Sequence, residues 1–168
     1  FGVSVSSGRL TSLAQDLLGV LPVTDARASH LAALSITLRT RAEALFRELS
    51  LAFPVEALEG RRGTDFTLTP EVVERIRPPA AAVLETLSAI AALTGDDDPD
   101  LGAVNRRAVE TGAALEHVVQ ADDGRQVYWA ETRGRSLALR AAPIDVGESL
   151  GRFLYEDVGA VIFTSATL

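Results

Sequence analysis

The sequence contains no cysteine, no methionine and no lysine among its 168 residues. Without cysteine, the chain can form neither a disulfide framework nor a thiolate metal site. Its two histidines, His30 and His117, are far apart and have no partner at a metal-ligand spacing, so we expect both to be structural or surface residues and expect no metal site. Because the chain begins at Phe1 and has no methionine, we expect it to be part of a longer protein.

Long hydrophobic runs and a positive charge balance are also missing. The longest apolar stretch, residues 80–93, is interrupted by Glu85, Thr86 and Ser88, whereas a membrane span needs roughly 20 apolar residues. We therefore expect no membrane helix. The formal net charge is −7, and all 16 basic residues are arginine. Proteins that coat nucleic acid neutralise phosphates with clustered cations, so this charge argues against a broadly positive surface and is compatible with a narrow basic track.

The apolar residues that are present repeat with a helical period. Hydrophobic residues make up 47% of the chain, which is typical of a globular protein. Residues 9–21 have apolar positions at the i, i+3, i+4 and i+7 spacing, which predicts a helix that Pro22 ends. Thr24 and Asp25 then offer a helix cap, and a leucine stripe predicts a second helix of close to thirty residues that continues to about Phe53.

Two later helices have strong start signals. Thr69 precedes Pro70 and Asp98 precedes Pro99, and a capping side chain followed by proline is typical of a helix start. The first of these helices is predicted to extend to Leu93, with the two prolines at residues 78–79 causing a kink or a break. The second is predicted to end near Gln120. The three aspartates at residues 96–98 are better explained by capping than by a calcium loop.

The remaining segments predict loops and strands. Residues 54–69 contain glycine and proline and predict a loop with a short helical turn at residues 55–58. Residues 126–131 and 136–142 predict a β-hairpin that Pro143 closes. Asp145 then caps a predicted helix to about Glu156, and residues 160–164 predict a strand buried on both faces. The composition changes near residue 122, which predicts a domain boundary there.

The last residues carry the most specific motif. Residues 164–168 read TSATL and follow the apolar residues 161–163, and residues 143–150 contain a P-I-D-x-x-x-x-L spacing. This segment resembles the part of DinG/XPD-type helicases that returns from an inserted domain to the first motor domain and contains the SAT motif. The resemblance implies that Ser165 and Thr167 contact the Walker B segment and couple ATP hydrolysis to unwinding without doing chemistry themselves. The alternative is a strand end with incidental hydroxyls.

The first residues, FGVSVSSGRLTSLAQDLL, resemble the segment after the DEAH box of bacterial DinG-like proteins, where the chain leaves the motor domain for the helical insertion called the Arch. The resemblance implies a mainly α chain. Residues 1–121 would form a four-helix Arch-like bundle, and residues 122–168 would form a hairpin, a helix and a strand, a small α/β piece of a RecA-like helicase domain. Residues 22–120 match only in position and helical character.

The family resemblance implies an ATP-dependent DNA helicase of DNA repair, located in the bacterial cytoplasm at the nucleoid, with ATP and Mg²⁺ as cofactors of the parent protein. The chain has neither a G-x-x-x-x-G-K-[ST] loop nor a D-E-A-H box, so we expect these residues to hold no cofactor and to be inactive alone. The cysteines of the iron–sulfur cluster found in many members would precede Phe1, so a cluster in the parent stays open.

In this family the Arch helps to form the opening for single-stranded DNA, a role that needs backbone charge and stacking side chains. The candidate DNA contacts are Arg61 and Arg62 in the loop and Arg106 and Arg107 near the start of the fourth helix, and for each pair the alternative is a solvated surface. Trp129 and its neighbour Tyr128 point to opposite faces of a strand, and we expect Trp129 to be in the core.

Two other functions compete with DNA guidance. The first is a helical protein–protein interaction module whose acidic surface repels DNA, and the net charge favours it. The second, a four-helix-bundle enzyme with a carboxylate metal site, fails because the paired Glu-x-x-His elements are missing. The predicted strand at residues 161–164 would also have unpaired edges, so we expect the isolated chain to dimerise, to swap strands or to pair this strand with the hairpin.

Overall fold

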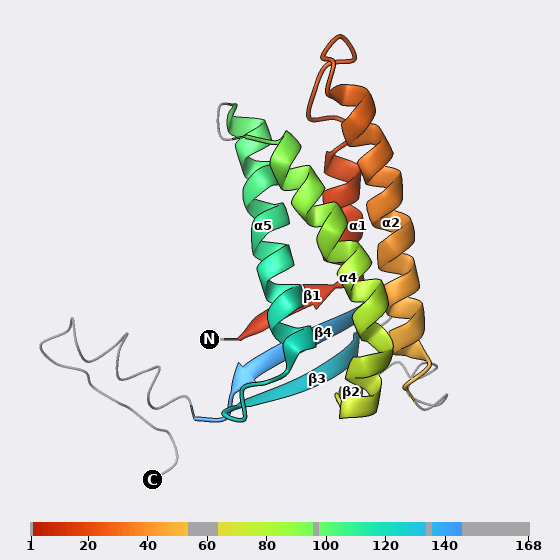
Figure 1. Ribbon diagram of the computed structural model, residues 1–168, viewed down its shortest axis with the longest axis vertical. Helices are drawn as coiled ribbons and strands as arrows, with labels where there is room; N and C mark the ends of the chain where they lie inside the picture. Colours follow the sequence, from red (N-terminus) through yellow and green to blue (C-terminus); the bar gives the residue numbers. More distant parts are fainter. Residues whose placement is uncertain (1, 54–63, 96–97, 134–135, 146–168) are drawn as a thin grey trace, which may run out of the picture.

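The computed structural model describes residues 2–53, 64–95, 98–133 and 136–145 (Figure 1). Within these residues lie four helices and four strands. In chain order they are β1 (Val3–Ser6), α1 (Ser7–Asp16), α2 (Ala28–Ser50), β2 (Thr64–Thr67), α4 (Pro70–Leu93), α5 (Pro99–Gln120), β3 (Gln126–Arg133) and β4 (Ser136–Pro143). The prediction of a mainly helical chain with a small β component is confirmed.

The four helices form a bundle that stands on the sheet. Helix α1 contacts α2 and α5, and α4 also contacts α2 and α5, so the helices close a ring around a shared interior. Figure 1 shows the sheet across one end of this bundle, with the loop between α1 and α2 at the opposite end. Strand residues such as Val5, Leu139 and Ala141 belong to the same buried core as the helices.

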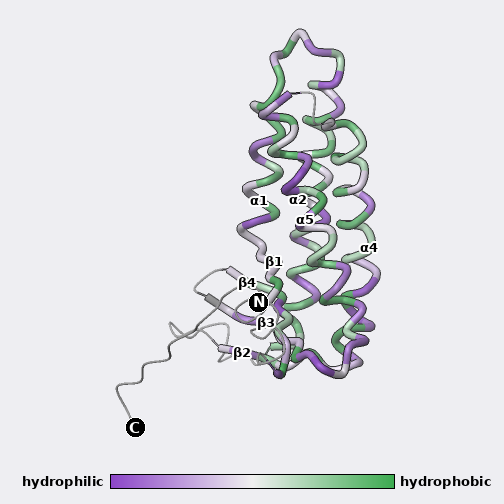
Figure 2. Tube along the Cα trace, turned by 90° about the vertical axis from the view of Figure 1, so that its left-hand side faces the viewer, coloured by the Kyte–Doolittle hydropathy of each residue, from purple (hydrophilic) through white to green (hydrophobic). Residues whose placement is uncertain are grey.

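Leucines form the centre of this core, as their spacing predicts. On α2, Leu31, Leu38, Leu45 and Leu49 are fully buried, and they recur at intervals of seven or four residues. Positions at this spacing lie on one side of a 3.6-residue helix. Figure 2 shows the bundle from the side, with hydrophobic and hydrophilic positions alternating along each helix. Burial of these stripes, rather than helix propensity alone, stabilises helices of this length.

The predicted helix starts are confirmed at α4 and α5, but only one of the two predicted capping side chains forms hydrogen bonds with the backbone of its helix. Asp98 accepts hydrogen bonds from the backbone N–H groups of Asp100 and Leu101, at 2.8 and 3.2 Å. Thr69 makes no such bond to the backbone of α4. Helix α5 ends where predicted, because Ala121 takes a left-handed conformation with φ of 46° and stops the helical ladder.

The two N-terminal helices are shorter than predicted. Helix α1 ends at Asp16, and the backbone N–H of Leu18 then bonds the carbonyl of Gln15 in a tighter turn. Helix α2 has 23 residues and begins at Ala28. Asp25, predicted as a helix cap, instead accepts a hydrogen bond of 2.8 Å from the backbone of Arg27 and closes the turn before the helix.

Helix α4 continues through Pro78 and Pro79 to Leu93, so the predicted break does not occur. Its buried positions include Ile76 and Ala80, on both sides of the prolines. Packing against α2 and α5 holds the helix together although two backbone N–H donors are missing. Among the described residues, α4 is also the helix that is long and apolar enough to cross a membrane by length and composition alone.

The sheet has the order β1-β4-β3-β2, and all its neighbouring strands are antiparallel. The predicted hairpin is confirmed as β3 and β4. Strand β2 lies at residues 64–67, where a loop was expected, so that prediction is wrong for these residues; residues 54–63 lie outside the described part. Strand β1 pairs with β4 from Val3 opposite Ala141 to Ser6 opposite Ala138. The sheet therefore combines strands from both sides of residue 122.

The hairpin residues alternate between the two faces of the sheet as expected, but the two aromatic side chains lie on the faces opposite to those predicted. Tyr128 is 8% exposed and belongs to the core, and its ring lies 6.0 Å from that of His117. Trp129 is half-buried and lies on the other face of the sheet. The prediction that Trp129 is a core residue is therefore wrong, because the helices cover the face to which Tyr128 points.

Candidate functional site

The structure describes one of the two predicted arginine pairs, Arg106 and Arg107, and the two side chains have different surroundings. Arg106 is exposed on α5. The Arg107 guanidinium forms an ion pair with Asp16 and a hydrogen bond of 3.3 Å with Ser12, so it ties α5 to α1. Arg107 is thus already occupied by a contact within the bundle. Arg61, Arg62, Ser165 and Thr167 lie outside the described residues.

Most of the other described arginine side chains are also paired. With Arg107 included, ion pairs join seven described arginines to carboxylates: Arg9, Arg27, Arg41, Arg77, Arg107, Arg125 and Arg140. Four exposed arginine side chains within the described part form neither an ion pair nor a hydrogen bond: Arg39, Arg47, Arg75 and Arg106. They are spread over three helices, so the described surface has isolated cations rather than a continuous basic track.

The face of the sheet that points away from the helices is a second candidate surface. The register places Ser4, Arg140, Trp129 and Thr67 in one row across its four strands. Glu131 is 13% exposed, and its carboxylate lies 2.6 Å from Arg140 Nε. A tryptophan beside an arginine suits base stacking. Here the arginine charge is neutralised by a mostly buried partner, so this row offers little attraction for phosphate.

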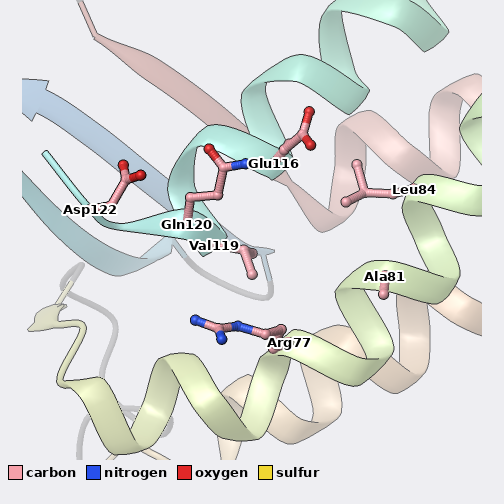
Figure 3. A pocket seen from close by; sticks show the side chains of 7 residues that line it. All are labelled: Arg77, Ala81, Leu84, Glu116, Val119, Gln120 and Asp122. Carbon is pink, nitrogen blue, oxygen red and sulfur yellow. The ribbon is translucent and has the colours of Figure 1, made fainter.

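A groove between α4 and α5 is the third candidate. It has a volume of about 370 Å³ and is lined by Arg77, Ala81, Leu84, Glu116, Val119, Gln120 and Asp122. Figure 3 shows Arg77 and Ala81 on α4 across from Val119 and Gln120 on α5, with Asp122 just past the end of α5. The groove combines an apolar floor with two carboxylates. The sequence gives no local signal for it, because it depends on how two helices diverge.

The described residues contain no group of three or more histidine, cysteine or carboxylate side chains that could hold a metal ion. Three carboxyl groups have a lowered pKa. Hydrogen bonds from the side chains of Arg27 and Thr69 lower the pKa of Asp25 and Glu71, and the backbone N–H of Arg125 lowers that of Asp123. Each shift favours the carboxylate at a turn or a helix start, where hydrogen bonds of this kind stabilise local structure.

Comparisons with known proteins assign no family. The sequence matches no protein-family model, no curated protein and no solved structure. Functional conclusions therefore depend on the residues and the geometry of this chain.

Proposed function

We propose that this chain is part of an ATP-dependent DNA helicase of the DinG/XPD type, with a helical accessory domain that guides single-stranded DNA. The observation that carries the proposal is the TSATL sequence at residues 164–168, after the apolar residues 161–163. The same resemblance extends to the first eighteen residues. The two resembling segments thus lie on either side of helices α2, α4 and α5.

The path of the chain supports an inserted domain. Strand β1 leads into the helices, and after the last helix, α5, the chain passes through β3 into β4, which is the hydrogen-bonded neighbour of β1. The chain therefore enters and leaves the bundle at the same end, opposite the tips of the helices (Figure 1). A domain inserted into another domain needs such adjacent ends, because both must connect to a continuous host fold.

In this proposal the two ends of the chain have different roles. The helical bundle would guide the strand, and Arg106 is the described predicted contact that has no protein partner. Ser165 and Thr167 would report the state of the nucleotide to the DNA path through hydrogen bonds of their hydroxyl groups. ATP and Mg²⁺ would be bound by a phosphate-binding loop and a DEAH box elsewhere in the parent protein, since neither motif is present here.

A protein–protein interaction module without DNA binding is the second candidate. The formal charge of −7 and the pairing of seven described arginines with carboxylates favour it. Phosphate binding requires cations that can displace the counterions of the nucleic acid, and a guanidinium already held by a carboxylate is a weak candidate for this.

Fluorescence anisotropy of labelled single-stranded DNA, titrated with the chain at low and moderate salt, separates the two candidates. For single strands, the slope of log affinity against log salt is negative, and its magnitude decreases by about 0.7 for each phosphate contact removed. Arg61→Ala with Arg62→Ala, and Arg106→Ala alone, should each weaken binding and reduce this slope. Arg39→Ala removes an exposed arginine from α2 and is the matched control. No binding at low salt would contradict DNA guidance and favour the interaction module.

A further inference from the structure

The groove between α4 and α5 exists because the two helices separate towards the sheet. At Gly112 they are close: a Cβ atom added there would lie 3.9 Å from Leu87 Cδ1 and 4.0 Å from Leu84 Cδ2. Two turns further along α5, Val119 lies across the groove from the part of α4 that contains Arg77 and Ala81, and the short side chain of Ala81 leaves space between the helices unfilled. The hollow thus has an apolar floor formed by Ala81, Leu84 and Val119.

The charges around this floor are unbalanced. Glu116 and Asp122 are exposed on the α5 side, and neither forms an ion pair within the described residues. Arg77 on the α4 side is paired with Glu74 at 3.0 Å, one helical turn away. The guanidinium of Arg77 is therefore already compensated, and the groove as a whole is negative.

We propose that this groove binds a basic peptide segment of a partner protein. One apolar side chain of the peptide would fill the hollow over Ala81, and arginine or lysine side chains on either side of it would pair with Glu116 and Asp122. The volume of about 370 Å³ is sufficient for an anchoring side chain and its neighbours. The two carboxylates disfavour nucleic acid as the occupant, because phosphate oxygens would face like charge. This proposal does not depend on the helicase function.

The complete 168-residue chain can be titrated into a fluorescein-labelled decapeptide with one central leucine flanked by arginines, and the anisotropy followed at low salt. We expect saturable binding. Glu116→Gln with Asp122→Asn should weaken it by about 3- to 10-fold, as two exposed ion pairs allow. Ala81→Leu fills the hollow and should weaken binding at least as much. Arg77→Gln should strengthen it by about 2-fold, because a like charge near the peptide is removed.

Controls separate this groove from general charge attraction. Glu43→Gln with Asp65→Asn makes the same change in net charge at exposed positions on α2 and β2, and should leave the affinity unchanged. A peptide with glutamates in place of arginines, or with serine in place of leucine, should bind weakly. The proposal is overturned if the arginine peptide does not bind, if Ala81→Leu has no effect, or if the control pair weakens binding equally. Circular dichroism of each variant verifies that it is folded.

Discussion

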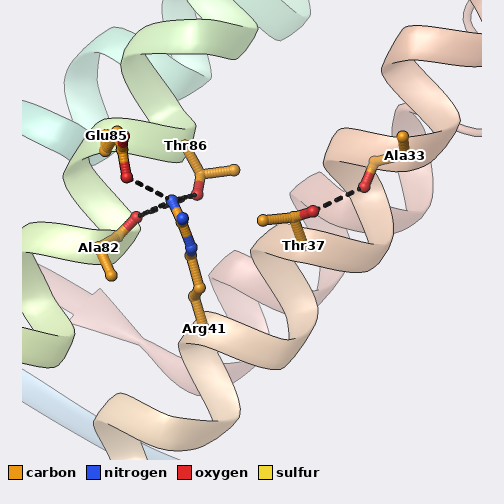
Figure 4. Close-up of polar contacts among 6 residues, drawn as sticks. All are labelled: Ala33, Thr37, Arg41, Ala82, Glu85 and Thr86. Atoms are coloured by element: carbon orange, nitrogen blue, oxygen red, sulfur yellow. Dashed lines mark hydrogen bonds and ion pairs between the residues drawn. The ribbon is translucent and has the colours of Figure 1, made fainter.

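Arg41→Ala is expected to lower the free energy of unfolding by about 1–2 kcal/mol. Arg41 extends from α2 to α4, where one of its terminal nitrogens, Nη1, contacts three oxygens (Figure 4). The distances are 2.8 Å to the carbonyl of Ala82, 2.8 Å to Glu85 Oε2 and 2.9 Å to Thr86 Oγ1. These contacts join two of the four helices near the middle of the bundle.

The size of the effect follows from how exposed each partner is. The side chain of Glu85 is 74% exposed, so its ion pair with Arg41 should contribute about 0.2–1 kcal/mol. The contacts with Ala82 and Thr86 are partly buried and charge-assisted, so they should contribute most of the remainder. Thr86 Oγ1 also donates to the carbonyl of Ala82 at 3.0 Å, so losing Arg41 leaves neither group without a partner and limits the cost.

Urea denaturation followed by circular dichroism measures this change, with the slope against urea expected to stay constant. Arg39→Ala is the matched control, because Arg39 is exposed on the same helix and has no partner within the described residues; its effect should stay within about 0.5 kcal/mol. A double-mutant cycle with Glu85→Gln isolates the ion pair. Equal losses for Arg41→Ala and Arg39→Ala would show that the contacts between α2 and α4 add nothing to stability.

Three other changes test separate parts of the fold. Asp98→Ala removes the cap of α5 and should cost about 1 kcal/mol in urea denaturation. Gly2→Ala should weaken the pairing of β1 with β4, measured as faster amide hydrogen exchange in β4, because the new Cβ would lie 2.7 Å from the carbonyl oxygen of Ala141. The Asp25 carboxyl should titrate below its ordinary pKa in an NMR titration, because the Arg27 side chain bonds its charged form. A lowered folded-state pKa stabilises the fold above the unfolded-state pKa, and this stabilisation is lost as the pH falls through the folded-state pKa, below about pH 4.

Each of these predictions can be checked against a second variant of the same chain. Thr69→Ala should cost less than Asp98→Ala, because Thr69 makes no side-chain bond to the backbone of α4; the reverse order would contradict the capping assignment. Gly19→Ala should leave hydrogen exchange in β4 unchanged, because an added Cβ there meets nothing within 4 Å. Arg27→Ala should move the titration of Asp25 back towards its ordinary value, and an unchanged titration would exclude the assigned cause.

The helices were predictable because their signals are local. A residue of the capping type before proline marks the starts of α4 and α5 within two residues, although only Asp98 forms the capping hydrogen bonds, and the leucine spacing identifies the buried side of α2. The edge strands, β1 and β2, were not predictable from local signals. Each has four residues, and β1 pairs with residues more than 130 positions away, so its conformation depends on a partner that no short window contains. The choice between Tyr128 and Trp129 as the core residue likewise depends on which face the helices cover.

The candidate surfaces were less predictable than the fold. Arg106 and Arg107 are neighbours in the sequence, but one points to solvent and the other is held by Asp16 of α1, a contact across 91 positions. The groove over Ala81 depends on the separation of two helices. Neither the pairing of a charge nor the separation of helices has a local pattern, so both require the tertiary structure.

The proposal that this chain belongs to a DNA helicase is tested most directly with the complete gene product, by measuring ATP hydrolysis and strand separation together. With ATP and Mg²⁺ present, single-stranded DNA should stimulate hydrolysis. Ser165→Ala with Thr167→Ala should keep hydrolysis and lose strand separation. Ser149→Ala, at one of the unspecified positions of the P-I-D-x-x-x-x-L spacing, is the control and should keep both. A gene product that neither hydrolyses ATP nor separates strands, or a double variant that unwinds at the rate of the unmodified protein, would contradict the proposal.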